Sequence, residues 1–110
     1  RQVISARTSA TISGMLVSAV DGVYDHKAKV AGYRVGGKTG TAQIADPKGG
    51  YGSDVDHTFV GFAPADDPKF VILVKLAKPT AVKHAADSTT VVFSRLAEFL
   101  LHYYQVPPNG

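Results

Sequence analysis

The most constraining feature of the sequence is an uninterrupted β-branched and aliphatic run at 69–77, Lys-Phe-Val-Ile-Leu-Val-Lys-Leu-Ala. A run of this kind fits a strand that is buried on both faces. It follows Pro64-Ala65-Asp66-Asp67-Pro68, which has the composition of a tight turn. A turn this short makes the strands on either side of it antiparallel neighbours. The strand before it, 57–63, alternates between two faces, with Thr58, Val60 and Phe62 on one and Phe59, Gly61 and Ala63 on the other.

Four further segments complete the predicted fold. Residues 34–45 form a long strand interrupted by glycines, and 46–56 has the Gly, Pro, Asp and Ser content of a loop. Residues 5–20 and 87–104 have the apolar periodicity of helices. We therefore expect an α+β fold, an antiparallel three-strand meander flanked by an N-terminal and a C-terminal helix. The expected apolar face of the first helix comprises Ile12, Met15, Leu16, Ala19, Val20 and Val23. That of the second comprises Val92, Leu96, Phe99, Leu100 and Tyr103, widened by Phe93, Ala97 and Tyr104.

The composition excludes several classes of function. The chain has 110 residues, 45% of them hydrophobic, which is typical of an ordinary globular protein. It has no cysteine, so disulfides, thiolate metal sites and cysteine nucleophiles are excluded. The net charge of +3 comes from scattered basic residues, whereas a nucleic-acid surface needs clustered ones. The histidines share no ligand spacing, so we expect no metal site and no cofactor.

The N-terminus has no targeting signal. Arg1-Gln2-Val3-Ile4 does not resemble a signal peptide and lacks an initiating Met. No apolar stretch approaches the roughly 20 residues of a membrane span. We expect the chain to begin inside a longer protein or to be an expressed segment of one.

One segment satisfies the phosphate-loop pattern G-x-x-x-x-G-K-[ST], from Gly32 to Thr39. In a phosphate loop the Lys-Thr pair opens a helix whose N-terminal amides hold the phosphates. Here Gly40 and Thr41 follow at once and Pro47 closes the stretch, which is poor helix material. A nucleotide site is therefore a weak alternative. A helix after Thr39 would support it and a strand would exclude it.

Interpreted as a strand, the same segment suggests a different site. Thr39 and Thr41 point to one side and Lys38 to the other. Gly40 has no side chain, so a ligand backbone could lie close to it. The two hydroxyls offer donors for a carboxylate or carbonyl, and the strand edge can pair with an extended peptide. His57 is expected at the start of the next strand, near the rim of the cleft.

The segment also resembles a known family. Gly37-Lys38-Thr39-Gly40-Thr41-Ala42-Gln43 is similar to the lysine-threonine-glycine motif of the penicillin-binding proteins. The segments at 58–64, 68–74 and 93–108 resemble, in order, the family's next two strands and its closing helix with a proline tail. The Phe-Val-Gly-Phe strand and the turn after it are most similar to the class B, monofunctional transpeptidases. The resemblance implies that 1–110 is the C-terminal fragment of one transpeptidase domain with a penicillin-binding-protein/serine β-lactamase-like fold.

The resemblance also implies roles for the motif residues. Lys38 would maintain the field and proton network around the nucleophile. The hydroxyls of Thr39 and Thr41, on either side of Gly40, would bind the terminal carboxylate of a D-Ala-D-Ala stem peptide or of a β-lactam. The backbone N–H of Thr41 would be half of the oxyanion hole. The implied activity is that of a peptidoglycan D,D-transpeptidase working by serine acyl transfer.

Two of the family's motifs are absent from the chain. No serine is followed at the third place by a lysine, and the one asparagine, Asn109, is not part of a Ser-x-Asn sequence. In the family both motifs lie upstream of the lysine-threonine-glycine motif. We therefore expect the fragment to be inactive alone. An alternative is a noncatalytic penicillin-binding sensor or receptor module of the same fold, which the upstream sequence would distinguish.

The resemblance implies partners and a location as well. The expected partners are peptidoglycan stem peptides, β-lactam antibiotics, the N-terminal part of the same catalytic domain, and cell-division or elongation proteins. The parent would be anchored in the inner membrane with its catalytic domain outside the cytoplasm. Without the N-terminal part, residues 70–77 would present an unpaired apolar edge, which favours association or instability.

Overall fold

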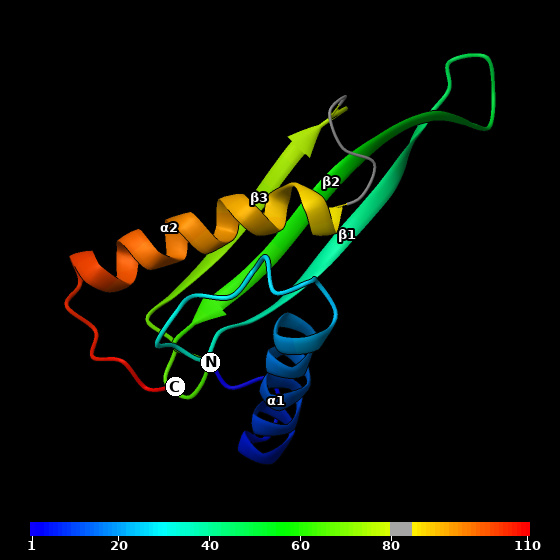
Figure 1. Ribbon diagram of the computed structural model, residues 1–110. Coiled ribbons are helices and arrows are strands. Elements are labelled where there is room, and N and C mark those ends of the chain that lie inside the picture. The colour runs from blue at the N-terminus through cyan, green and yellow to red at the C-terminus, as the bar shows by residue number, and fades with distance from the viewer. Residues whose placement is uncertain (80–84) are drawn as a thin grey trace.

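The computed structural model describes residues 1–79 and 85–110 (Figure 1). The helix α1 spans Ala6–Gly22 and the strands β1, β2 and β3 span Gly36–Ala45, Tyr51–Ala63 and Phe70–Ala77. A short 3-10 turn, η1, spans Ala85–Asp87 and leads into α2, which spans Thr89–Tyr103. The order helix, three strands, helix is the predicted one.

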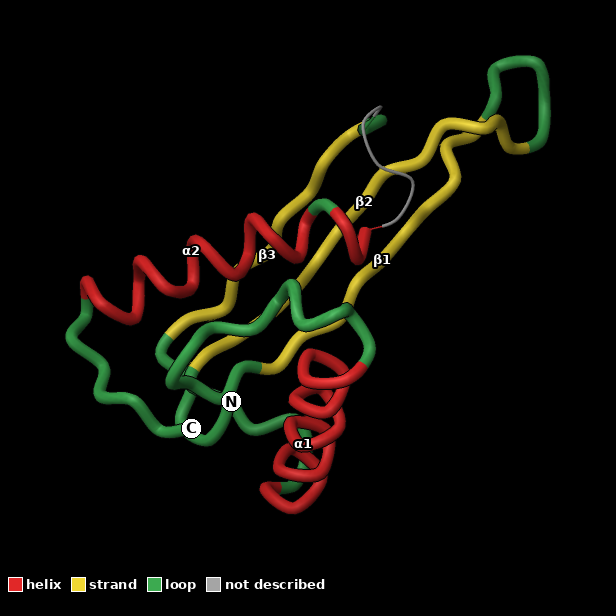
Figure 2. The backbone as a smooth tube through the Cα atoms, viewed as in Figure 1, coloured by secondary structure: helices red, strands yellow, loops and turns green. Residues whose placement is uncertain are grey.

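The three strands form one antiparallel sheet in the order β1-β2-β3 (Figure 2). β1 and β2 pair from Gly36 opposite Phe62 as far as Ala45 opposite Tyr51. β3 pairs with the second half of β2 only, so the far part of the β1–β2 hairpin extends beyond it (Figure 1). The predicted α+β meander with two flanking helices is therefore confirmed.

One face of the sheet is covered by α2, which lies across it in Figure 1. Phe59 at the middle of β2 is fully buried, and its ring lies 4.7 Å from the ring of Phe93 on α2. Val74 is directly opposite Phe59 on β3 and is also buried. Burial of these side chains is the main source of stability. The core as a whole comprises Val20, Tyr24, Ala28, Val30, Tyr33, Val35, Phe59, Ala63, Val74, Phe93, Ala97 and Leu101.

The hairpin is longer than the sequence predicts. Residues 46–56 were expected to be a loop, but β2 begins at Tyr51. The side chain of Asp46 accepts a hydrogen bond from the N–H of Lys48 at 2.8 Å, and the N–H of Asp46 donates to the carbonyl of Gly50 at 2.9 Å. This compact turn brings Tyr51 opposite Ala45. Hydrogen bonding to β1 therefore overrides the weak strand propensity of this Gly-, Ser- and Asp-rich segment.

The predicted apolar face of α2 is correct only in part, at Phe93 and Ala97. The helix buries Thr89, Thr90, Phe93, Ala97 and Leu101. The stripe that periodicity favoured is exposed, with Phe99 and Tyr103 at 63% and 68%. α2 is apolar around most of its circumference, so the sequence pattern does not select one face. Gly61 allows close packing of the stripe that is buried, because a Cβ there would lie 2.5 Å from the ring of Phe93.

The predicted face of α1 is correct only in part. α1 buries Val17 and Val20, whereas Ile12 and Met15 are exposed. Ser5 caps the start of the helix, since its Oγ accepts from the N–H of Thr8 at 3.0 Å. The helix packs against β1 rather than across the sheet (Figure 1).

β3 is buried on one face only, which corrects the expectation of burial on both. Val71 and Leu73 are exposed at 70% and 68%, on the face of the sheet opposite α2. Val60, their neighbour on β2, is 44% exposed. The sheet therefore has one packed face and one open apolar face within the described residues.

The C-terminal tail returns to the start of β1. The amide N–H of Asn109 donates to the carbonyl of Gly32 at 3.0 Å, and its Oδ1 accepts from the N–H of Arg34 at 3.0 Å. The Tyr33 hydroxyl donates to the carbonyl of Val106 at 2.6 Å. These bonds hold the entry to β1 against the end of the chain.

Candidate active site

The lysine-threonine-glycine segment lies in β1, a strand from Gly36 to Ala45. Thr39 is followed directly by the rest of β1, not by a helix. A phosphate loop requires that helix, so the nucleotide alternative is excluded.

The register places the motif side chains on two faces. Thr39 lies opposite Phe59 and Thr41 opposite His57, and both of these β2 side chains are fully buried on the side of α2. Lys38 lies opposite Val60, on the open face. Thr39 is half-buried, whereas Lys38 and Thr41 are exposed. The alternation predicted for this strand is therefore the one observed.

The backbone N–H and C=O of Thr41 point away from β2, toward the unpaired edge of the sheet. For Thr39, two residues earlier, the same outward direction follows from two observations. The N–H of Thr39 donates to the Tyr24 hydroxyl at 3.3 Å rather than to β2. The carbonyl of Val60 points toward β1, since it lies 2.9 Å from the position of a Cβ on Gly37. Because outward and inward groups alternate along an antiparallel strand, the N–H and C=O of Thr41 also point outward.

Gly40 leaves room for its neighbour on β2. A Cβ at this position would lie 2.5 Å from Oγ1 of Thr58, which faces it across the pair. The Thr58 hydroxyl donates to the carbonyl of Gly40 at 3.4 Å. The sequence suggested that this glycine leaves space for a ligand, and the structure adds an internal reason for it.

His57 is in the interior of β2, not at its start. Its side chain is fully buried, and its Nδ1 lies 2.8 Å from Oγ of Ser88, the residue before α2. The neighbouring Asp87 accepts a hydrogen bond from the Lys27 ammonium. That bond raises the pKa of Lys27. The segment that leads into α2 is thus tied both to β2 behind Thr41 and to the loop after α1.

Two side chains contact the outward backbone groups of Thr39, two residues before Thr41 on the same edge. The Tyr24 hydroxyl accepts from the N–H of Thr39, and the Lys38 ammonium donates to the carbonyl of Thr39 at 3.0 Å. Lys38 therefore reaches the edge although its side chain starts on the opposite face from the threonines. Tyr24 was missed by sequence reasoning, because it lies in a stretch that has only the character of a polar connection. A buried tyrosine shortly after a helix carries no pattern that predicts this contact.

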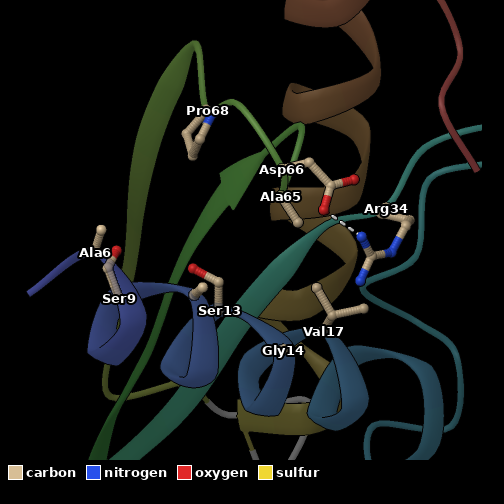
Figure 3. Close-up of a pocket in the computed structure, with 10 residues that line it drawn as sticks. Ala6, Ser9, Ser13, Gly14, Val17, Arg34, Ala65, Asp66 and Pro68 are labelled. Carbon is tan, nitrogen blue, oxygen red and sulfur yellow. Dashed lines mark hydrogen bonds and ion pairs between the residues drawn. The ribbon is translucent and has the colours of Figure 1, made fainter.

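A separate groove of about 370 Å³ lies between α1 and the turn after β2. Figure 3 shows the small residues Ser9, Ser13 and Gly14 on one side and the Arg34–Asp66 ion pair on the other. None of its lining residues belongs to β1. The groove is therefore distinct from the edge of the sheet that carries the motif.

The described residues contain no cluster of three His, Asp or Glu side chains that could hold a metal ion. In the same part of the chain, neither helix is both long enough and apolar enough to cross a membrane.

The chain is similar to proteins of bacterial cell-wall synthesis. It is 40% identical to the penicillin-binding protein PbpB of Mycolicibacterium smegmatis, over 96% of this chain and 18% of that protein. The transpeptidase domain of Burkholderia pseudomallei penicillin-binding protein 3 superposes with a TM-score of 0.88 and 34% identity, over 100% of this chain and 34% of that one. Penicillin-binding protein 3 of Mycobacterium tuberculosis, in a complex with ampicillin, superposes with a TM-score of 0.83 and 32% identity, over 96% of this chain and 26% of that one.

The chain thus spans less than a fifth of the length of PbpB and about a third of the solved domain. Residues 1–98 match the family described as the penicillin binding protein transpeptidase domain. The chain belongs to this family, in its class B branch.

Proposed function

We propose that this chain is part of a peptidoglycan D,D-transpeptidase, in which β1 forms the wall that binds the substrate carboxylate and stabilises the oxyanion. The observation that carries the proposal is the outward N–H of Thr41 on an edge strand. A backbone donor held by a sheet is preorganised, so it can stabilise developing charge without reorganising during the reaction. Family membership supports the same assignment.

The reaction requires a serine from outside this chain, because the sequence has no Ser-x-x-Lys and no Ser-x-Asn. That serine would attack the carbonyl of the penultimate D-Ala, and the carbonyl electrons would move to its oxygen. The N–H of Thr41 would donate to this oxyanion. Collapse of the intermediate would break the bond to the terminal D-Ala, whose nitrogen would take up the proton that the serine hydroxyl lost and leave as an amine, with an ester remaining on the serine. An amine from a second stem peptide would then attack the ester and release the serine.

The motif side chains have separate tasks in this scheme. The hydroxyls of Thr39 and Thr41 lie on one face of β1 and would donate to the terminal carboxylate of the substrate. Lys38 would add a positive charge at the same edge, where its ammonium already donates to the carbonyl of Thr39. Gly40 adds no side chain between the two threonines.

The same groups suit a β-lactam, which also presents a reactive carbonyl and a carboxylate. The related protein from M. tuberculosis has been solved with ampicillin, which supports this part of the proposal. We further propose that the N-terminal part of the domain supplies the nucleophile, and that the parent protein is membrane-anchored with this domain outside the cytoplasm. Partners from cell division or elongation would bind surfaces of that parent.

The test is labelling of the complete transpeptidase with a fluorescent penicillin, comparing wild type with Thr41→Val. The wild type should form a stable acyl-enzyme. Thr41→Val keeps the backbone N–H but removes the hydroxyl, so we expect acylation to be slower by about tenfold, the value of one charge-assisted hydrogen bond. Thr11→Val, an exposed threonine of α1, is the matched control and should leave the rate unchanged.

Two results would count against the proposal. A wild-type domain that forms no acyl-enzyme would refute the transpeptidase assignment. Labelling that is equally strong in Thr41→Val would refute the role of the hydroxyl while leaving that of the backbone N–H intact.

A further inference from the structure

The outward edge of β1 is closed at Thr39 and accessible from Thr41 onward. Both outward groups of Thr39 have partners from the chain itself: its N–H donates to the Tyr24 hydroxyl at 3.3 Å and its C=O accepts from the Lys38 ammonium at 3.0 Å. Thr41, the next outward residue, is exposed. The boundary between the closed and accessible parts therefore falls inside the motif.

Tyr24 is held firmly in place. It is 4% exposed, and its ring makes an edge-to-face contact with Phe59 at 5.9 Å. Phe59 is itself fully buried and lies directly opposite Thr39. The hydroxyl that meets the N–H of Thr39 is thus fixed by the same core that supports the strand. Lys38, in contrast, has an exposed side chain.

The position of this boundary matters because of the periodicity of a strand. An extended ligand paired with β1 could shift by two residues, about 6.6–6.8 Å, and still direct every side chain to the same face. The alternation of the sheet therefore does not distinguish a carbonyl bound at Thr41 from one bound at Thr39. Only the first would be in place for the nucleophile.

We propose that Tyr24 is a positioning residue that sets the register of the ligand on β1. Because its hydroxyl already accepts from the N–H of Thr39, a ligand carbonyl cannot bind at Thr39 in place of Thr41. This inference rests on the proposed function, because it concerns the ligand of the same strand edge. It assigns a role to a residue outside the motif, 15 positions before Thr39.

The role has a distinctive kinetic signature. A ligand that also binds in the shifted register is held unproductively, so the maximal acylation rate and the half-saturating concentration fall by the same factor. Their ratio, which describes the free enzyme and free ligand, does not change. Loss of a merely structural contact would distort Thr41 and lower the ratio itself.

The experiment measures acyl-enzyme formation by the complete transpeptidase domain over a range of fluorescent penicillin concentrations, with rapid quenching. The variant is Tyr24→Phe, which keeps the ring against Phe59 and removes only the hydroxyl. We expect the maximal rate and the half-saturating concentration each to fall about threefold to tenfold, the affinity that one additional hydrogen bond gives the shifted complex.

The matched control is Tyr33→Phe. Tyr33 is also nearly buried, and its hydroxyl donates to the carbonyl of Val106 at 2.6 Å, away from the outward edge of β1. This variant removes the same atom from a comparable environment, so it should leave both kinetic constants unchanged. Melting temperatures of the two variants show how much each hydroxyl contributes to folding.

Three results would overturn the proposal. In the first, Tyr24→Phe leaves both constants unchanged. In the second, it lowers the ratio while the half-saturating concentration stays constant, which would indicate a structural role. Both leave the transpeptidase assignment intact, since the wild type is still acylated. In the third, the wild type itself forms no acyl-enzyme, which refutes the proposed function and the register role together.

Discussion

The two edges of this sheet differ in chemistry. On β1, the outward groups of Thr39 are bonded to Tyr24 and Lys38, and the hydroxyl-bearing Thr41 follows as an accessible position. β3 instead ends the sheet with an apolar strand whose Val71 and Leu73 are exposed. One edge is polar and partly closed by specific contacts, whereas the other is apolar apart from Lys75, which forms an ion pair with Asp56 of β2.

Both edges lack a partner strand among the described residues, and this difference indicates that the two missing partners differ in kind. An unpaired edge is an aggregation hazard unless it is charged, short or covered. β1 has polar side chains, and the buried Tyr24 of the loop after α1 is hydrogen-bonded to it. Together these limit pairing to a short stretch, as the proposed ligand site requires. β3 has the composition of a strand with further neighbours. This contrast leads to three predictions.

The largest expected effect is on β1. Thr41→Pro removes the outward N–H as well as the hydroxyl, so acylation of the complete domain should fall about 100- to 1,000-fold below that of Thr41→Val, the cost of losing an oxyanion-hole donor. Stability should change little, because proline is tolerated where an edge N–H faces away from the ladder. Rapid-quench labelling gives the rate and thermal melting the stability.

Gln43→Pro is the control for this experiment, since Gln43 is the next outward residue on the same edge. It should retain most of the activity. An equal loss in both variants would mean that the strand tolerates no proline and that the N–H of Thr41 has no special role.

An intermediate effect is expected at Gly40. Gly40→Ala places a Cβ 2.5 Å from Oγ1 of Thr58, so that side chain must rotate and lose its bond to the Gly40 carbonyl. We expect a loss of about 1–2 kcal/mol in the free energy of unfolding of the complete domain, measured by urea denaturation.

The double variant Gly40→Ala with Thr58→Ala tests the cause. Only the Thr58 Cβ, at 3.9 Å, then remains near the added methyl group, which is an ordinary contact. The double variant should be nearly as stable as Thr58→Ala alone. If the two losses simply add, the clash with Oγ1 is not the reason for the glycine.

The smallest effect on folding is expected on β3. Val71→Lys changes an exposed side chain, so the free energy of unfolding should shift by less than about 0.5 kcal/mol. We predict that the isolated chain associates through this edge and that the lysine suppresses association, as charges do on natural edge strands. Sedimentation velocity over a range of concentrations measures this directly.

Gln43→Lys adds the same charge to the other edge and should leave association unchanged. A wild-type chain that sediments as a thermostable monomer at all concentrations would contradict the prediction. So would equal suppression by the two lysine variants, since the effect would then be one of net charge.

Much of the site could be predicted from local sequence. The alternation of Thr39 and Thr41 against Lys38 follows from strand periodicity, which every strand obeys. The hairpin was predicted less well, because the composition of 51–56 favours a loop and only pairing with β1 makes it a strand. The buried stripe of α2 was predicted only at Phe93 and Ala97, since apolar residues surround most of that helix.

The sequence by itself determined the order of the elements, the antiparallel meander and the motif strand, because these depend on periodicity and turn chemistry between near neighbours. Only the tertiary structure decided which stripe of α2 is buried and which strand edge is closed. Packing selects the stripe through the space that Gly61 leaves for Phe93. The edge of β1 is closed by the hydrogen bond from the N–H of Thr39 to the Tyr24 hydroxyl, and no local sequence pattern relates the two segments that make it.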